Sequence, residues 1–387
     1  MTAVSLISYI DRNTLALLAP TILRELRLSA EQYGYVISAF SLAYMASNPL
    51  WGNWLDRFGL RWGMVAAVTA WTIASASHAL AAGFVALVVA RAALGFGEGA
   101  TFPGGIRAAM QTLPVSLQSR GTAIAYSGGS LGAVLTPIVI TPIAARWGWR
   151  GAFWVTGLIG AAWVLGWIVV SRRPGLRTPP ATAPRVAAAV SPGDRRLWAL
   201  VFAYAFGALP LGFVLYTAPI YLSRALGQTQ LEIGHVLWIP PLGWEAGYLF
   251  WSWMIDRLAQ AKGPSVGVYA RVMGTACALS LPLILTPRLP SLALVLAELF
   301  LAMFAGAAFI MGALAYATFA FTTARAGLLA GVGAGSWSAV VAVVMPVFGR
   351  LLDQQRYGEA FALAAAFPVA GFLGWLLLAR GGSDRGR

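Results

Sequence analysis

The chain has 387 residues, of which 59% are hydrophobic and only 10% are charged, and its formal net charge is +14. A soluble domain carries about 25% charged residues and cannot bury this much apolar surface, so the composition excludes a soluble globular protein. The apolar runs are about 20 residues long, which suits a helix crossing a bilayer and exceeds a barrel strand. The basic residues lie in short loops between these runs, which indicates membrane orientation rather than nucleic-acid binding.

We predict an all-α membrane protein with twelve transmembrane helices in two pseudo-symmetric six-helix bundles. The first six apolar segments cover approximately residues 2–23, 32–54, 62–81, 84–106, 121–143 and 151–171. The last six cover approximately residues 197–222, 231–254, 271–287, 291–315, 326–349 and 358–379. Between the two sets lies a stretch rich in proline and arginine, which is typical of a linker. The predicted domains are therefore an N-terminal bundle (1–171), a cytoplasmic linker (172–196) and a C-terminal bundle (197–387).

An Asp-Arg pair follows the second predicted helix, at 56–57, and another follows the eighth, at 256–257. Matching positions in two halves indicate an internal duplication, as secondary transporters often have, although a chance repeat of this dipeptide is the alternative. If both termini are cytoplasmic, the loops on that side hold about twice as many Lys and Arg residues as the other loops. No basic stretch precedes the first apolar run, so no cleaved signal peptide is expected. We expect a monomeric multi-pass protein of a bacterial plasma membrane with both termini inside.

Six ionisable residues within the predicted spans stand out. A charge in the hydrocarbon layer costs about 2.5–3.5 kcal/mol, so each is a candidate for function. They are Asp11, Arg12, Arg91, Glu98, Glu245 and Glu298. Adjacent helix positions point about 100° apart, so Asp11 and Arg12 each need their own partner. Arg91 and Glu98 are two helical turns apart on one face. We expect that face to meet the first helix, so that two acids and two arginines line one polar cavity.

These residue types suit the binding of an anion together with protons. An arginine stays charged in a cavity and binds a carboxylate through two parallel hydrogen bonds. Burial favours the protonated form of an acid, which can then load and release a proton. The alternative is a set of ion pairs that only fix helix packing. For Glu245 the functional and the packing interpretation have equal weight. For Glu298 we favour a position at the membrane interface, with its carboxylate in water.

Enzymatic and metal chemistry find little support in the sequence. The one cysteine, Cys277, excludes an intramolecular disulfide and a cysteine metal cluster. The two histidines, His78 and His235, make a histidine-rich metal site improbable. No set of nucleophile and base stands out. We therefore expect a protein that is not an enzyme and that has no cofactor and no metal.

The loop after the second predicted helix carries a twelve-residue motif. Residues 52–63 read G-N-W-L-D-R-F-G-L-R-W-G. This resembles the G-x-x-x-D-R-x-G-x-R-x-G signature of the major facilitator superfamily. The resemblance implies that Asp56, Arg57 and Arg61 form a cytoplasmic latch for one conformation. The second copy departs from the motif, because Ser252 stands where the signature has glycine.

Three further stretches narrow the resemblance. Residues 9–12 read Y-I-D-R, residues 91–103 match R-x-x-x-G-x-G-E-x-x-x-x-P, and residues 148–153 read G-W-R-G-A-F. Over residues 9–170 the chain is similar to the anion:cation symporters, the group that includes hexuronate and galactonate carriers and sialin. The helix-five stretch departs from that group's N-S-G, since Tyr126 precedes Ser127.

The resemblance implies roles residue by residue. Asp11 and Glu98 match proton-binding acids, and Arg12 and Arg91 match arginines of substrate binding and coupling. Glu245 resembles an acidic position of helix eight. The remaining expected substrate-binding residues are Tyr9, Tyr44, Ser127, Tyr216, Ser336 and Trp337, together with the further pocket candidates Tyr204, Tyr316 and Ser338. For the aromatic and hydroxyl residues of helices seven, ten and eleven, a lipid-facing or interfacial position is the alternative.

The expected function is proton-coupled symport of a small organic anion, such as a sugar acid or another monocarboxylate, by alternating access. The expected partners are this anion, protons and the lipid bilayer, and no nucleic acid. One alternative is a drug or metabolite:proton antiporter, which the intramembrane arginines disfavour because they repel a cation. A proton-independent uniporter stays open. A membrane enzyme or a transport-dead sensor is the alternative from another class.

Overall fold

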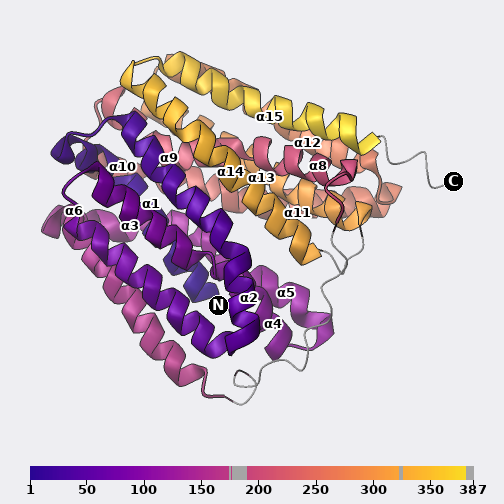
Figure 1. Ribbon diagram of the computed structural model, residues 1–387. Coiled ribbons are helices and arrows are strands. Elements are labelled where there is room, and N and C mark those ends of the chain that lie inside the picture. The colour runs from indigo at the N-terminus through magenta and orange to yellow at the C-terminus, as the bar shows by residue number, and fades with distance from the viewer. Residues whose placement is uncertain (174–175, 177–189, 322–325, 381–387) are drawn as a thin grey trace. The chain divides into compact units, whose positions relative to one another are not determined.

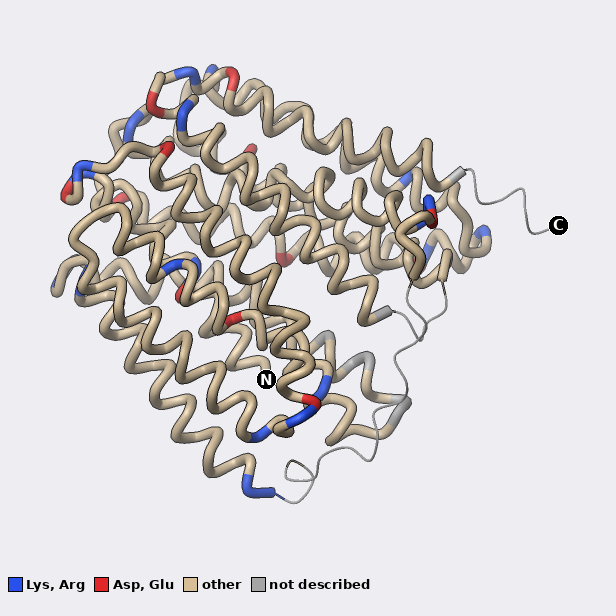
Figure 2. Tube along the Cα trace, in the orientation of Figure 1, with Lys and Arg blue, Asp and Glu red and all other residues tan. Residues whose placement is uncertain are grey.

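The computed structural model describes the chain apart from residues 174–175, 177–189, 322–325 and 381–387 (Figure 1). Within the described residues every regular element is a helix, and there is no strand. Long stretches of helix carry no charged residue, and most charges lie near helix ends (Figure 2). This pattern is the one expected of helices that cross a hydrocarbon layer.

The first half contains the longest helices of the chain. Its elements are α1 (Thr2–Leu26), α2 (Ala30–Ser77), η1 (His78–Leu80), α3 (Phe84–Glu98), α4 (Thr101–Thr112), α5 (Val115–Tyr126) and α6 (Gly128–Val170). Helix α2 bends at Gly59, where φ is 81°, and α6 bends at Gly148, where φ is 69°. A positive φ favours glycine, so each glycine divides one long helix into two spans. These bends fall where the sequence predicts loops.

The second half is divided into shorter helices. Its elements are α8 (Arg195–Val201), η2 (Phe202–Phe206), α9 (Leu209–Arg224), α10 (Gln230–Val236), α11 (Ile239–Lys262), α12 (Val266–Ser280), η3 (Leu281–Arg288), α13 (Leu292–Ala320), α14 (Ala326–Asp353) and α15 (Tyr357–Arg380). Eight helical stretches of the described residues are long and apolar enough to cross a membrane. Two of these are the bent stretches, with two spans each. The spans of α1 and of α10 with α11 complete the twelve predicted helices, so the predicted fold class is confirmed.

The chain forms two compact units by its internal contacts. Unit 1 contains Met1–Arg185, Leu222–Trp238 and Ala342–Arg350, and unit 2 contains Val186–Tyr221, Ile239–Val341 and Leu351–Arg387. Two short segments that follow the linker in sequence therefore belong to unit 1. Most of the predicted linker (172–196) lies outside the described residues, and the predicted division of the chain there stays a prediction.

Close helix packing inside unit 1 brings α1, α2, α3 and α6 together. A Cβ atom on Gly132 of α6 would lie 2.7 Å from the carbonyl oxygen of Leu6 on α1. One on Gly97 of α3 would lie 2.7 Å from Cβ of Trp71 on α2. Any side chain would push these helices apart, so glycine permits the close approach. The inner faces of four helices thereby meet around the predicted charged residues.

Unit 2 uses the same device between α11 and α13. A Cβ atom on Gly247 would lie 2.7 Å from Cβ of Ala307, and the indole nitrogen of Trp251 donates to the carbonyl of Phe304 at 2.9 Å. The indole hydrogen bond satisfies a polar group that would otherwise be buried without an acceptor. The two helices are thus held at short range over several turns.

Candidate functional site

Four charged residues meet inside unit 1, two from α1 and two from α3. Asp11, Arg12, Arg91 and Glu98 are 1%, 6%, 0% and 0% exposed, respectively. Asp11 and Arg12 bond to different helices, as their neighbouring positions predicted. All four side chains are buried, and their predicted position along one polar cavity stays a prediction.

Arg12 and Glu98 form an ion pair at the centre of this cluster. The Nε atom of Arg12 lies 2.5 Å from Oε2 of Glu98. The hydroxyl of Ser8 donates to the same carboxylate oxygen at 2.7 Å. Ser8 lies one helical turn before Arg12, so both point to α3 from one face of α1. The sequence analysis missed Ser8, although its spacing from Arg12 was a usable signal.

Asp11 turns to the other side of α1, where two hydroxyl residues hold it. The Ser75 hydroxyl donates to Oδ1 of Asp11 at 2.7 Å, and it lies 2.9 Å from the hydroxyl of Thr156. Ser75 belongs to α2 and Thr156 to α6. Ser75 lies 64 residues from Asp11 in the chain, and Thr156 lies 81 residues from Ser75, so no local pattern marks them. Sequence reasoning missed both.

Arg91 and a group of aromatic rings complete the cluster. An Nη atom of Arg91 donates to the backbone carbonyl of Arg12 at 3.1 Å. Both guanidinium groups lie over the ring of Phe40, at 4.8 and 4.9 Å from its centroid. Arg12 also lies 4.8 Å from the ring of Tyr9 and 4.4 Å from that of Tyr44. The rings stabilise the buried cations through their π faces. The predicted tyrosines are therefore next to Arg12, and Phe40 was missed.

Each acid of the cluster has one oxygen that receives no hydrogen bond. Within the described residues, no donor reaches the buried Oδ2 of Asp11 or the buried Oε1 of Glu98. A buried carboxylate oxygen without a donor is costly, and protonation of the acid removes the charge. With both acids ionised the four charges cancel. With both protonated the cluster carries two positive charges, which an anion can neutralise.

The three predicted gating residues lie at the bend of α2. Asp56 forms an ion pair with Arg107 of α4, a partner that the sequence analysis did not single out. The carbonyl of Arg61 accepts a hydrogen bond from the indole of Trp167 at 3.1 Å. Arg57 lies over the ring of Phe58 at 5.5 Å. The motif thus connects the bend of α2 to α4 and α6, and its gating role stays a prediction.

The other predicted binding residues lie apart from the charged cluster in the chain. Ser127, between α5 and α6, donates to the carbonyl of Ile124 at 2.9 Å. Four more belong to unit 2 and are described there by themselves: Glu245 is half-buried in α11, Tyr216 is buried in α9, and Ser336 and Trp337 lie in α14. The Trp337 indole donates to the carbonyl of Ala208 at 3.2 Å. Their part in substrate binding stays a prediction.

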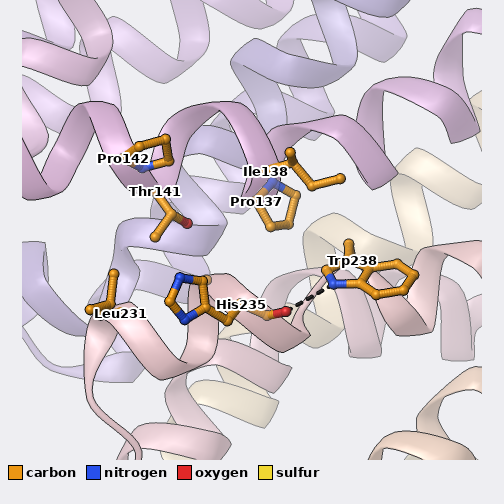
Figure 3. A pocket seen from close by; sticks show the side chains of 8 residues that line it. Pro137, Ile138, Thr141, Pro142, Leu231, His235 and Trp238 are labelled. Carbon is orange, nitrogen blue, oxygen red and sulfur yellow. Dashed lines mark hydrogen bonds between the residues drawn. The ribbon is translucent and has the colours of Figure 1, made fainter.

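A cavity of about 310 Å³ lies between α6 and α10 in unit 1. Figure 3 shows its lining side chains, with the Trp238 indole donating to the carbonyl of His235 at 2.8 Å. The lining contains no Arg, Lys, Asp or Glu: it consists of Pro137, Ile138, Thr141, Pro142, Leu231, Gly234, His235 and Trp238. An organic anion requires a cationic or strongly donating surface. The charged cluster is therefore the better candidate for its binding site.

The G-W-R motif holds the end of α1, away from the cluster. The Trp149 indole donates to Oε2 of Glu25 at 2.7 Å, and Arg150 forms an ion pair with Oε1. Arg150 also donates to the carbonyl of Ala81 at 3.3 Å. The hydrogen bonds from Arg150 and Trp149 hold the pKa of the Glu25 carboxyl below its usual range. The motif thus ties the end of α1 to the bend of α6.

Comparisons with known proteins give one consistent result. The sequence profile described as Major Facilitator Superfamily matches residues 1–334. The chain is 24% identical to the hexuronate transporter of Escherichia coli strain K12, over 95% of this chain and 90% of that protein. It is 30% identical to the D-galactonate transporter of Escherichia coli O6:H1, over 70% and 69%. The crystal structure of a bacterial homologue of the human lysosomal transporter Spinster, in an inward-facing and occupied conformation, matches with a TM-score of 0.82 at 16% identity, covering 98% of this chain and 95% of that one.

Proposed function

This chain belongs to the major facilitator superfamily, and we propose that it is a proton-coupled symporter of small organic anions that works by alternating access. The family match confirms two expectations from the sequence, a multi-pass membrane transporter rather than an enzyme and the all-α fold. The substrate, the proton coupling and the orientation in the membrane are what we propose.

The proposed cargo is a monocarboxylate such as a sugar acid. Two similar proteins are described as transporters of hexuronate and of D-galactonate, and each of these compounds carries a carboxylate. In this chain Arg12 and Arg91 are the charged donors that suit such a group. Arg12 presents a planar guanidinium that can bind both oxygens of a carboxylate. Tyr9 and Tyr44 lie against that guanidinium and suit the sugar part of the cargo.

The observation that carries the coupling is the buried pair of Arg12 and Glu98. When Glu98 takes up a proton, Arg12 loses its anionic partner inside the protein. A buried cation that loses a neighbouring negative charge is destabilised, and a substrate carboxylate restores that charge. Proton binding and anion binding therefore support one another, which is the requirement for symport. We assign Asp11 as the second proton-binding group, because it is the second acid of the cluster and protonation removes its negative charge.

The same charge balance disfavours antiport of a cationic drug. When both acids are protonated, a cation entering the cluster meets two arginine charges that no carboxylate balances, and it is repelled. We further propose a monomer in a bacterial plasma membrane with both termini cytoplasmic. The Lys and Arg bias of the loops and the bacterial relatives support this orientation and location. Asp56, Arg57 and Arg61 then form a gate at the cytoplasmic end, together with Arg107.

The test is uptake of radiolabelled sugar acids into proteoliposomes with an imposed pH gradient, acidic outside. We expect accumulation above the external concentration, and collapse of that accumulation when a protonophore dissipates the gradient. Equal rates with and without the gradient indicate a uniporter. Uptake of a lipophilic cation driven by the opposite gradient, with no sugar-acid uptake, indicates an antiporter. Either result overturns the proposal.

A further inference from the structure

A chain of hydrogen-bonding groups leads from Asp11 into the packing of α2 and α6. It runs from Oδ1 of Asp11 to the Ser75 hydroxyl at 2.7 Å, and from there to the Thr156 hydroxyl at 2.9 Å. The Thr156 hydroxyl in turn lies 3.1 Å from the backbone carbonyl of Phe153. Asp11, Ser75 and Thr156 are each 1% exposed. The three polar side chains are thus shielded from solvent and depend on one another for hydrogen bonds.

Glycines of α6 place Thr156 within reach of Ser75. A Cβ atom on Gly157 would lie 2.9 Å from Cβ of Ala76, and one on Gly160 would lie 3.2 Å from Cβ of Thr72. The two helices therefore approach too closely for any larger residue at these positions. Because the backbones are fixed at this distance, the hydroxyl groups on either side have a defined separation. The chain of groups is a product of this packing.

Counting the protons on these hydrogen-bonding groups shows two arrangements in which every hydroxyl proton has an acceptor. Each hydroxyl has one proton to donate and can also accept. When Asp11 is ionised, Ser75 donates to Oδ1 and Thr156 donates to Ser75. When a proton from the aqueous phase binds at Oδ1, Asp11 donates to Ser75, Ser75 to Thr156, and Thr156 to the carbonyl of Phe153. Every hydroxyl proton has an acceptor in both cases, and only hydroxyl rotation separates them.

We propose that Ser75 and Thr156 are positioning residues that hold Asp11 in both its ionised and its protonated state by reversing the direction of this hydrogen-bond chain. The inference rests on the proposed function, in which Asp11 carries a proton during transport. A buried acid that must alternate between two charge states would otherwise leave a polar group without a partner in one of them. The reversible chain gives Oδ1 a hydrogen-bond partner in both states without a movement of heavy atoms.

Other ionisable groups face Asp11 and act on it independently of the hydroxyls. Arg12 lies beside it on α1, and Glu98 and Arg91 of α3 act on it through their charges. At the end of α2, the buried Nδ1 of His78 lies 3.2 Å from the carbonyl of Ser75. From α6, the Thr156 hydroxyl reaches the Asp11 carboxyl through Ser75. Variants of Ser75 and Thr156 leave all four ionisable groups in place, so they test the hydroxyl chain alone.

The experiment measures uptake against pH, with equal pH on both sides, for Ser75→Ala and Thr156→Val. Ser75→Ala removes the donor to the ionised carboxylate and also the acceptor for the protonated acid. Because a hydrogen bond to a charged group is the stronger of the two, the ionised form loses more stabilisation and Asp11 keeps its proton to higher pH. We expect the alkaline midpoint of uptake to rise by about 0.5–1 pH unit, the difference between a charged and a neutral hydrogen bond. We expect a smaller shift in the same direction for Thr156→Val. In both variants kcat falls while KM stays within about twofold, because the two hydroxyls bond at Asp11 and not at the Glu98 carboxylate that faces Arg12.

Conservative variants separate this role from packing. Ser75→Thr and Thr156→Ser keep a hydroxyl, and we expect the unmodified pH midpoint in both. Thr136→Val is the matched control, since Thr136 is also buried on α6 and its hydroxyl donates to the carbonyl of Gly132 at 2.7 Å, outside the chain. An unshifted midpoint in Ser75→Ala, or equal losses in Ser75→Ala and Ser75→Thr, overturns the proposal.

A spectroscopic measurement distinguishes failure of this inference from failure of the proposed function. Infrared difference spectra during a pH titration report the carbonyl stretch of a protonated carboxyl, and the band lost in Asp11→Asn belongs to Asp11. We expect Ser75→Ala to move both the frequency and the titration midpoint of this band, whether or not transport depends on a pH gradient. An unchanged band in Ser75→Ala overturns the hydroxyl chain even if proton-coupled uptake is observed.

Discussion

The side chains of Arg12 and Glu98 form a buried ion pair between α1 and α3, with Nε 2.5 Å from Oε2, although 86 residues separate them in the chain. A buried pair of this kind contributes little net stability, yet removal of one partner alone costs about 3–5 kcal/mol. Such a pair is poorly explained as a stabilising device and well explained as a site where one anion replaces another. In the proposed function, Glu98 is the anion of the resting site and the cargo carboxylate takes its place.

Replacing Arg12 tests this exchange. We expect Arg12→Gln to reduce uptake more than about 100-fold and to lower stability by about 3–5 kcal/mol, since it leaves the Glu98 carboxylate buried and unpaired. The double variant Arg12→Gln with Glu98→Gln should regain most of that stability without regaining uptake. Thermal unfolding in detergent and uptake in proteoliposomes measure the two effects. A double variant that transports at the unmodified rate contradicts the assignment of Arg12 to substrate binding.

Replacing Glu98 alone separates coupling from binding. Glu98→Gln keeps an acceptor for Ser8 and cannot lose or gain a proton. We expect exchange of internal for external substrate to continue, whereas accumulation driven by a pH gradient disappears. Counterflow and gradient-driven uptake in the same proteoliposome preparation measure the difference, and Asp11→Asn provides a comparison at the second acid. Gradient-driven accumulation by Glu98→Gln at the unmodified level means that Glu98 does not carry the coupled proton.

Much of this arrangement follows from local sequence, and the rest follows from tertiary packing. The cost of charge in lipid identified Arg12 and Glu98, and the spacing of Arg91 and Glu98 predicted a helix face that meets the first helix. Ser75 and Thr156 were missed because serine and threonine are common in transmembrane helices and become significant only through contacts between distant segments. Phe40 was missed for the same reason.

The bend of α2 shows the same division between local and tertiary information. The motif at residues 52–63 marked the loop, and its central glycine adopts the positive φ that ends one span and begins the next. The pairing of Asp56 with Arg107 was not predictable, because it depends on where α4 lies.

The ion pair of Asp56 and Arg107 is the next point to test. Asp56 is largely exposed, so the pair should contribute below about 1 kcal/mol to stability. If the pair latches one conformation, Asp56→Asn and Arg107→Gln should each lower the transport rate roughly tenfold, a free-energy change near 1.4 kcal/mol. The charge-swapped variant, Asp56→Arg with Arg107→Asp, should recover part of the rate. Uptake rates in a double-mutant cycle measure the coupling, and additive losses show that the contact has no part in gating.

The contact of Glu25 with Arg150 and Trp149 predicts a pH-dependent contribution to stability. The pKa of Glu25 is lowered by its hydrogen bonds, first from Arg150 and then from Trp149, so the folded state binds its proton less tightly than the unfolded state does. The stabilisation is therefore present above the ordinary glutamate value, near 4.3, and is lost as the pH falls below it. Because the pair is exposed, we expect Glu25→Gln to lower stability by less than about 1 kcal/mol at pH 7 and to match the unmodified protein near pH 3. Melting temperatures of both proteins across that range measure the effect, with Trp149→Phe as the variant that removes the indole hydrogen bond and keeps an aromatic ring. A difference that persists unchanged to pH 3 would mean that Glu25 acts through packing rather than through its charge.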